Sequence, residues 1–120
     1  MQMIQSVLKE ISAETSLTAD ELVAMQTLLE TAQEQSGQSG FALSRERLLA
    51  AGIHLAAVMR RASKGEVFPA LEPALLEQVD PAMKEISRRV LNAAEVTAKC
   101  REDATEVLLL AVHFAAAQQS

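Results

Sequence analysis

The chain has 120 residues and one cysteine, so it is long enough to bury a core and cannot form an intramolecular disulfide. Hydrophobic residues make up 49% of the sequence but aromatic residues only 2%, which disfavours a β-sandwich and favours helices packed through small and aliphatic side chains. The net charge is −5 and the basic residues fall in small separate groups, so we expect no direct nucleic-acid binding.

The first half of the chain carries the start signals of three helices. Apolar residues at spacings of three and four predict a short amphipathic helix from Met3 to Ala13. Thr18 and Glu21 have the spacing of a capping box, in which each side chain accepts a hydrogen bond from the backbone of the other residue, and predict the start of a second helix. Ser44 is expected to cap the third helix, which continues to about Ser63.

Glycines mark two predicted helix ends and one place where two helices are expected to pack closely. The loop at residues 36–40 contains two of them and is predicted to end the second helix. Gly65 is predicted to end the third helix. Gly52 lies inside the third helix, where a missing side chain suits a neighbouring helix that packs closely.

The second half of the chain is predicted to add a short helix and two longer ones. A short helix is expected from Pro73 through Val79. Asp80 followed by proline is a strong start signal for the next helix, and Asp103 is expected to cap the last one. Together the elements predict an all-α fold, a single-domain antiparallel bundle of about five helices.

The last helix contains a run of eleven residues, Val107 to Ala117, that are all apolar except His113. Because about 20 apolar residues are needed to cross a bilayer, we interpret this run as a buried core helix and expect no membrane association. The first residues, Met1 to Ile11, lack the basic start and long apolar stretch of a signal peptide, so we expect a cytoplasmic protein.

Each histidine has a charged residue seven positions away on its own predicted helix. Seven residues turn an α-helix by about 700°, so His54 shares a face with Arg61, and Glu106 shares a face with His113, about 10 Å apart. The residues alone leave two interpretations open: histidines that fill structural positions in the core, and histidines that act in function.

Other kinds of chemistry find little support in the sequence. No HxxxH or HExxH pair and no second thiol are present, so we expect no metal site and no cofactor. Nothing marks Ser63, Ser87 or Cys100 as an activated nucleophile, so we expect no nucleophile–base triad and name no catalytic residues.

Two motifs resemble those of a known family. The segment HLAAVMRR, from His54 to Arg61 with Gly65 after it, and the segment EVLLLAVH, from Glu106 to His113, are similar to the two histidine motifs of the PTS regulation domain (PRD). This all-helical module occurs in bacterial antiterminators and activators that the sugar phosphotransferase system controls. The resemblance covers about residues 19–120, which leaves residues 1–18 as a short N-terminal helix and linker.

The resemblance implies a stand-alone, single-PRD regulatory protein that acts in transcriptional control and is not an enzyme with turnover. In the family, the phosphocarrier protein HPr or an enzyme II component phosphorylates the two histidines, here His54 and His113. Arg61 and Arg60 are placed to receive the new charge, with Glu106 as a supporting residue. The phosphoryl group would then alter a homodimer or a contact with a partner.

One position departs from the family's pattern. The family usually has an aspartate directly before its first histidine, where this chain has Ile53. A neighbouring carboxylate orients the imidazole, so its absence argues against phosphorylation of His54. The main alternative is a helical protein-interaction module in which the histidines are structural. A two-component phosphotransfer domain ranks lower, because Lys64-Gly65 lies ten residues past His54 rather than directly after it.

Overall fold

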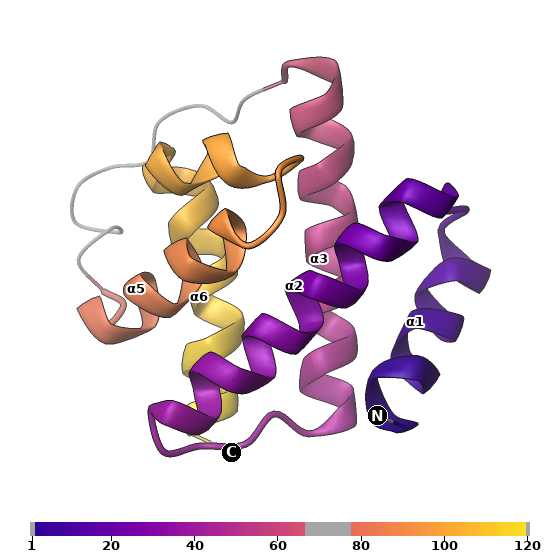
Figure 1. The fold of residues 1–120 in the computed structure, drawn as a ribbon. Helices are drawn as coiled ribbons and strands as arrows, with labels where there is room; N and C mark the ends of the chain where they lie inside the picture. Colours follow the sequence, from indigo (N-terminus) through magenta and orange to yellow (C-terminus); the bar gives the residue numbers. More distant parts are fainter. Residues whose placement is uncertain (1, 67–77, 120) are drawn as a thin grey trace.

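The computed structural model describes residues 2–66 and 78–119, and all regular structure within these ranges is helical (Figure 1). The elements in chain order are α1 (Gln2–Glu14), α2 (Ala19–Gln38), α3 (Arg45–Lys64), α5 (Pro81–Asn92), the 3₁₀ helix η1 (Ala98–Glu102) and α6 (Ala104–Gln118). The predicted all-α helical bundle is therefore confirmed. The short helix predicted from Pro73 lies largely outside the described residues.

The predicted helix starts are confirmed by their side-chain caps. Thr18 and Glu21 form the expected capping box at the start of α2. The Ser44 hydroxyl accepts a hydrogen bond from a backbone N–H of α3, and the carboxylates of Asp80 and Asp103 do the same for α5 and α6. Each cap satisfies backbone donors that have no partner inside the helix, which is why these positions begin helices.

Helix α3 lies at the centre of the bundle (Figure 1). It packs against α1 on one side and α6 on the other, while α2 crosses it at an angle. The colours of Figure 1 show that α3 and α6 run in opposite directions. This antiparallel contact sets which residues of the two histidine motifs meet.

A single apolar core joins all the helices. The core includes buried apolar residues of α2, α3, α5 and α6, and from α1 it includes Ile4, Val7, Leu8 and Ile11. Gly52 lies where α1 and α2 approach α3, because a Cβ atom at this position would overlap Cδ1 of Ile11 and lie 3.4 Å from Cδ2 of Leu29. The close approach predicted for Gly52 is thus confirmed.

Two details of the chain differ from the prediction. Helix α2 continues through Gly37 to Gln38, so only the second glycine of the predicted loop, Gly40, has a positive φ, of 90°. The η1 helix, which residues 93–97 separate from α5, was not predicted. Among the described residues, no helix has both the length and the apolar character that crossing a bilayer would require.

Candidate functional site

The two histidine motifs meet along the contact between α3 and α6. The rings of His54 and His113 face each other with their centroids 5.2 Å apart and their planes inclined by 47°. Two helical turns further along the same contact, Arg61 on α3 forms an ion pair with Glu106 on α6. Because the helices are antiparallel, the seven-residue spacing on each brings the two pairs into register. We call these four residues the α3–α6 seam.

The ion pair of the seam is bidentate and buried. Arg61 donates from Nε to Oε2 of Glu106 at 3.1 Å and from Nη2 to Oε1 at 2.9 Å. The Glu106 side chain is 3% exposed and the Arg61 side chain 18%. Asp103 caps the first turn of α6, where Glu106 lies, and thereby positions the carboxylate. A buried carboxylate requires such a partner, so this pair holds α3 and α6 together.

The histidines of the seam are half-buried and electrically neutral at neutral pH. Burial, and then the charges of His113 and Arg61, lower the pKa of His54 to about 4. Burial and then the charge of Arg47 lower the pKa of His113. A neutral imidazole has one nitrogen with a free lone pair, so each ring can act as a nucleophile or hydrogen-bond acceptor.

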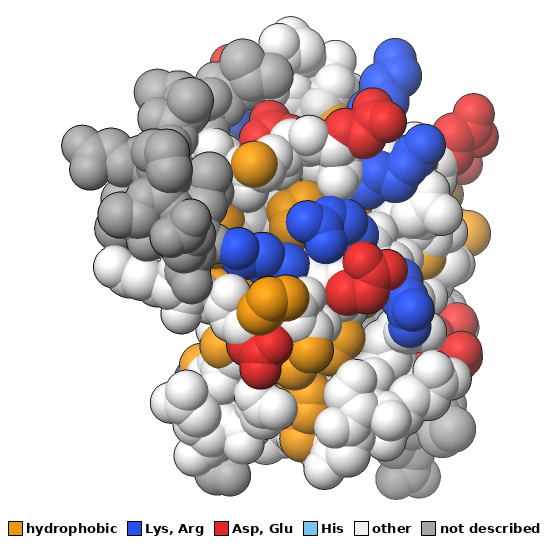
Figure 2. Space-filling model, turned by 90° about the vertical axis from the view of Figure 1, so that its left-hand side faces the viewer, with side chains coloured by type: hydrophobic (Ala, Val, Ile, Leu, Met, Phe, Trp, Pro, Cys, Tyr) orange, Lys and Arg blue, Asp and Glu red, His pale blue; other side chains and the backbone are white. Residues whose placement is uncertain are grey.

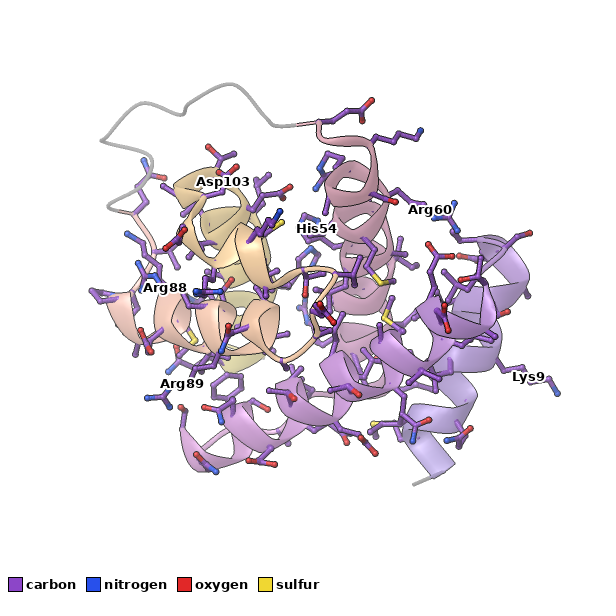
Figure 3. All side chains as sticks on the ribbon, turned by 45° about the horizontal axis from the view of Figure 1, so that its top comes forward. Lys9, His54, Arg60, Arg88, Arg89 and Asp103 are labelled. Atoms are coloured by element: carbon purple, nitrogen blue, oxygen red, sulfur yellow. The ribbon has the colours of Figure 1, made fainter. Side chains whose placement is uncertain are left out.

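The two imidazoles differ in accessibility. The Nε2 atom of His54 is buried and makes no hydrogen bond within the part of the chain that the structure describes. In Figure 3, His54 lies on the side of α3 that faces α6. No atom of His113 is buried in this unpartnered way among the described residues. Direct attack by the Nε2 atom of His54 on a phosphoryl donor would therefore require the surrounding residues to move.

An exposed aliphatic side chain precedes each histidine. Ile53 is 41% exposed and Val112 is 48% exposed. In two antiparallel helices that face each other through residues 54 and 113, the preceding residues lie on the same side of the contact. The surface beside the histidines is thus apolar, and Ile53 occupies the position where a carboxylate would have adjoined His54.

Arg60 is not brought to the histidines. It donates to the carboxylate of Glu21, from Nε at 3.1 Å and from Nη2 at 3.4 Å, and also to the carbonyl oxygen of Ser16. Figure 3 shows Arg60 directed away from His54, toward α2 and the segment before it. Arg60 therefore ties α3 to the start of α2, whereas its neighbour Arg61 belongs to the seam.

One residue of the site was missed by the sequence analysis. Arg47 lies in the first turn of α3, seven residues before His54, and its charge helps to lower the pKa of His113. The signal was present in the sequence, because Arg47, His54 and Arg61 repeat at a spacing of seven and so share one helix face.

Other reactive groups near the seam give no second site. Burial, and then the negative charges of Glu106 and Asp103, raise the pKa of the Cys100 thiol, which keeps it protonated and weakly nucleophilic. Within residues 2–66 and 78–119 there is no group of three or more His, Cys, Asp or Glu side chains that could hold a metal ion.

The face of the molecule shown in Figure 2 carries charges of both signs. Lysine, arginine and acidic side chains are mixed there with hydrophobic ones, without a continuous tract of one sign. No histidine is visible on the described part of this face.

Comparison with known proteins supports the fold. No family model matches the chain, and no curated protein sequence matches it. The structure is similar to that of a PRD-containing transcription regulator from Lactobacillus casei ATCC 334, with a TM-score of 0.70 and 20% sequence identity. The match covers 92% of this chain and 94% of the other. The protein therefore has a PRD-like helical fold.

Proposed function

We propose that this protein is a PRD-type regulatory module that accepts a phosphoryl group on a histidine of the α3–α6 seam. The observation that carries the proposal is the pairing of His54 with His113, 5.2 Å apart, at the contact of two helices. The donor is a phosphocarrier protein or an enzyme II component of the sugar phosphotransferase system, which acts in the cytoplasm. The module works as a switch in transcriptional control rather than as an enzyme with turnover.

Within the pair, His113 is the acceptor. The Nε2 atom of His54 is buried, and Ile53 replaces the carboxylate that would have oriented its ring. The free lone pair of neutral His113 attacks the phosphorus atom of a protonated phosphohistidine on the donor. A new N–P bond forms as the donor's N–P bond breaks, and its electron pair returns to the donor ring. Each ring keeps its own N–H proton, so the donor leaves as a neutral imidazole.

The phosphoryl group changes the charge of the seam and thereby its contacts. It adds about −1.5 to −2 units of charge at neutral pH. This charge appears beside the exposed aliphatic side chains of Ile53 and Val112, a surface suited to contact with another protein. Phosphorylation therefore shifts an equilibrium between copies of the chain, which we propose to form a homodimer, or between the chain and a partner.

Reconstituted phosphotransfer tests this function. The chain is incubated with the general phosphotransferase enzyme, HPr and labelled phosphoenolpyruvate, beside a variant with both His54→Gln and His113→Gln. We expect label on the wild type and none on the double variant. An Arg60→Gln variant is the control for a change on α3 outside the seam, and it should be labelled like the wild type. Absence of label on wild type, or equal label on the double variant, refutes the proposal.

A second candidate is a helical protein-interaction module in which the histidines are structural. The burial of His54 and the exposed Ile53 before it favour this candidate. Sedimentation of the same samples separates the two functions. A chain that takes up no phosphoryl group but self-associates, and loses self-association after Val112→Asp, identifies the interaction module.

A further inference from the structure

We propose that Arg47 is the positioning residue for the phosphoryl group on His113, and that Arg61 is retained by Glu106 as a structural clamp. This inference rests on the proposed function and names the residue that regulates the same site. It assigns different roles to two arginines that occupy equivalent positions on α3, one seven residues before His54 and one seven residues after it.

Arg61 is held in place by Glu106. Its guanidinium is held by two hydrogen bonds to a carboxylate that is 3% exposed. If Arg61 moved to a phosphoryl group, Glu106 would keep its charge in a buried place without that partner. Glu106 also lines a hollow of about 480 Å³ whose other described charged residues are Glu66, Glu95, Lys99 and Asp103. Three of these four are acidic, so the hollow offers poor compensation.

Arg47 lies near the start of α3, two turns before His54. Its side chain is exposed, whereas that of Arg61 is only 18% exposed. It lies on the α3 face that looks toward α6, because seven residues bring it back to the orientation of His54. Its positive charge contributes to the lowered pKa of His113, whereas the charge of Arg61 contributes to the lowered pKa of His54. The positive charge of Arg47 would therefore attract a phosphoryl group on His113.

An arginine side chain is chemically suited to bind a phosphoryl group. The guanidinium donates from several N–H groups in a fixed plane, a geometry that matches phosphoryl oxygens. Its positive charge stabilises the dianionic form of the phosphoryl group over the monoanionic form. Removal of Arg47 is therefore expected to raise the second pKa of the phosphoryl group by about 1 unit.

The test uses ³¹P NMR on the full chain phosphorylated at histidine. Phosphoryl groups are introduced in parallel by the phosphotransferase proteins and by potassium phosphoramidate, a small reagent that needs no protein contact. Loss of labelling only in the first arm overturns the proposed function as a carrier-dependent switch and leaves the Arg47 inference measurable in the second. Absence of labelling at His113 in both arms overturns the function and the inference together.

The variants are chosen to fold. Arg47→Gln keeps the α3 cap, because the cap uses the backbone N–H of residue 47. Arg45→Gln is the matched control, since Arg45 lies in the same turn but donates to Ser6 and Glu10 on α1. The double variant Arg61→Gln plus Glu106→Gln removes the rival arginine without leaving a buried charge alone.

We expect the second pKa of the phosphoryl group to rise by about 1 unit in Arg47→Gln and to recover partly in Arg47→Lys. It should stay at the wild-type value in Arg45→Gln. An unchanged value in Arg47→Gln overturns the inference, and so does an equal rise in the double variant at the Arg61–Glu106 pair. A merely structural role for Arg47 would change stability but not this titration.

Discussion

The ion pair between Arg61 and Glu106 should contribute far more to stability than an exposed pair of similar geometry in the same chain. The comparison is with Arg45 and Glu10, whose N···O distance is 2.8 Å against 2.9 Å in the seam. The side chains of Arg45 and Glu10 are 41% and 39% exposed, whereas those of Arg61 and Glu106 are 18% and 3% exposed. The two ion pairs thus have nearly the same N···O distance and differ mainly in how deeply their side chains are buried.

Burial decides the magnitude because a carboxylate left without its partner keeps its charge in a poorly solvated place. Arg61→Ala is expected to lower the free energy of unfolding by about 3–5 kcal/mol. Arg45→Ala should lower it by no more than about 1 kcal/mol, since solvent screens an exposed pair. In the variant Arg61→Ala plus Glu106→Ala no charge remains buried, so part of the loss should be recovered.

Urea denaturation followed by circular dichroism measures these differences. With a slope of about 2 kcal/mol per molar urea, the midpoint should fall by about 2 M for Arg61→Ala and by less than about 0.5 M for Arg45→Ala. Equal midpoints for the two single variants would refute the reasoning from burial. A double variant as unstable as the sum of its two single changes would show that the buried carboxylate is not the cause.

Three further predictions concern the core, the histidines and a cap. Gly52→Ala should destabilise the protein by about 1–3 kcal/mol because the new methyl group meets Ile11, whereas Gly37→Ala, which meets nothing within 4 Å, should stabilise it by up to about 1 kcal/mol; thermal unfolding compares them. His54 should titrate by NMR near its folded pKa of about 4. In the unfolded chain the imidazole of His54 binds a proton near pH 6.5, so the free energy of unfolding should fall as the pH drops from about 6.5 to 4. This fall should be smaller in His54→Gln. Asp103→Ala should destabilise α6 by about 1 kcal/mol through the lost cap, measured by urea unfolding.

The helices themselves could be predicted from the sequence because their signals are local. The caps at Thr18, Ser44, Asp80 and Asp103 depend on side chains within three residues of the backbone groups that they satisfy. The end of α2 was harder, because Gly37 is compatible with a helix as well as with a loop and local chemistry does not decide between them.

The site could be predicted only in part because it depends on a contact between distant segments. The spacing placed His54 with Arg61 on one face and Glu106 with His113 on another. It did not say that the two faces meet in antiparallel register, which pairs histidine with histidine and arginine with glutamate. Adjacent arginines were equally difficult to separate, because one step of about 100° sends Arg60 to α2 and Arg61 to α6.

The central claim is that His113 accepts a phosphoryl group at the contact between α3 and α6. The most direct measurement is the ³¹P NMR spectrum of the chain after incubation with the general phosphotransferase enzyme, HPr and phosphoenolpyruvate. We predict one phosphohistidine resonance that persists in His54→Gln and disappears in His113→Gln. A wild-type spectrum without this resonance, or a resonance of equal intensity in His113→Gln, would contradict the claim.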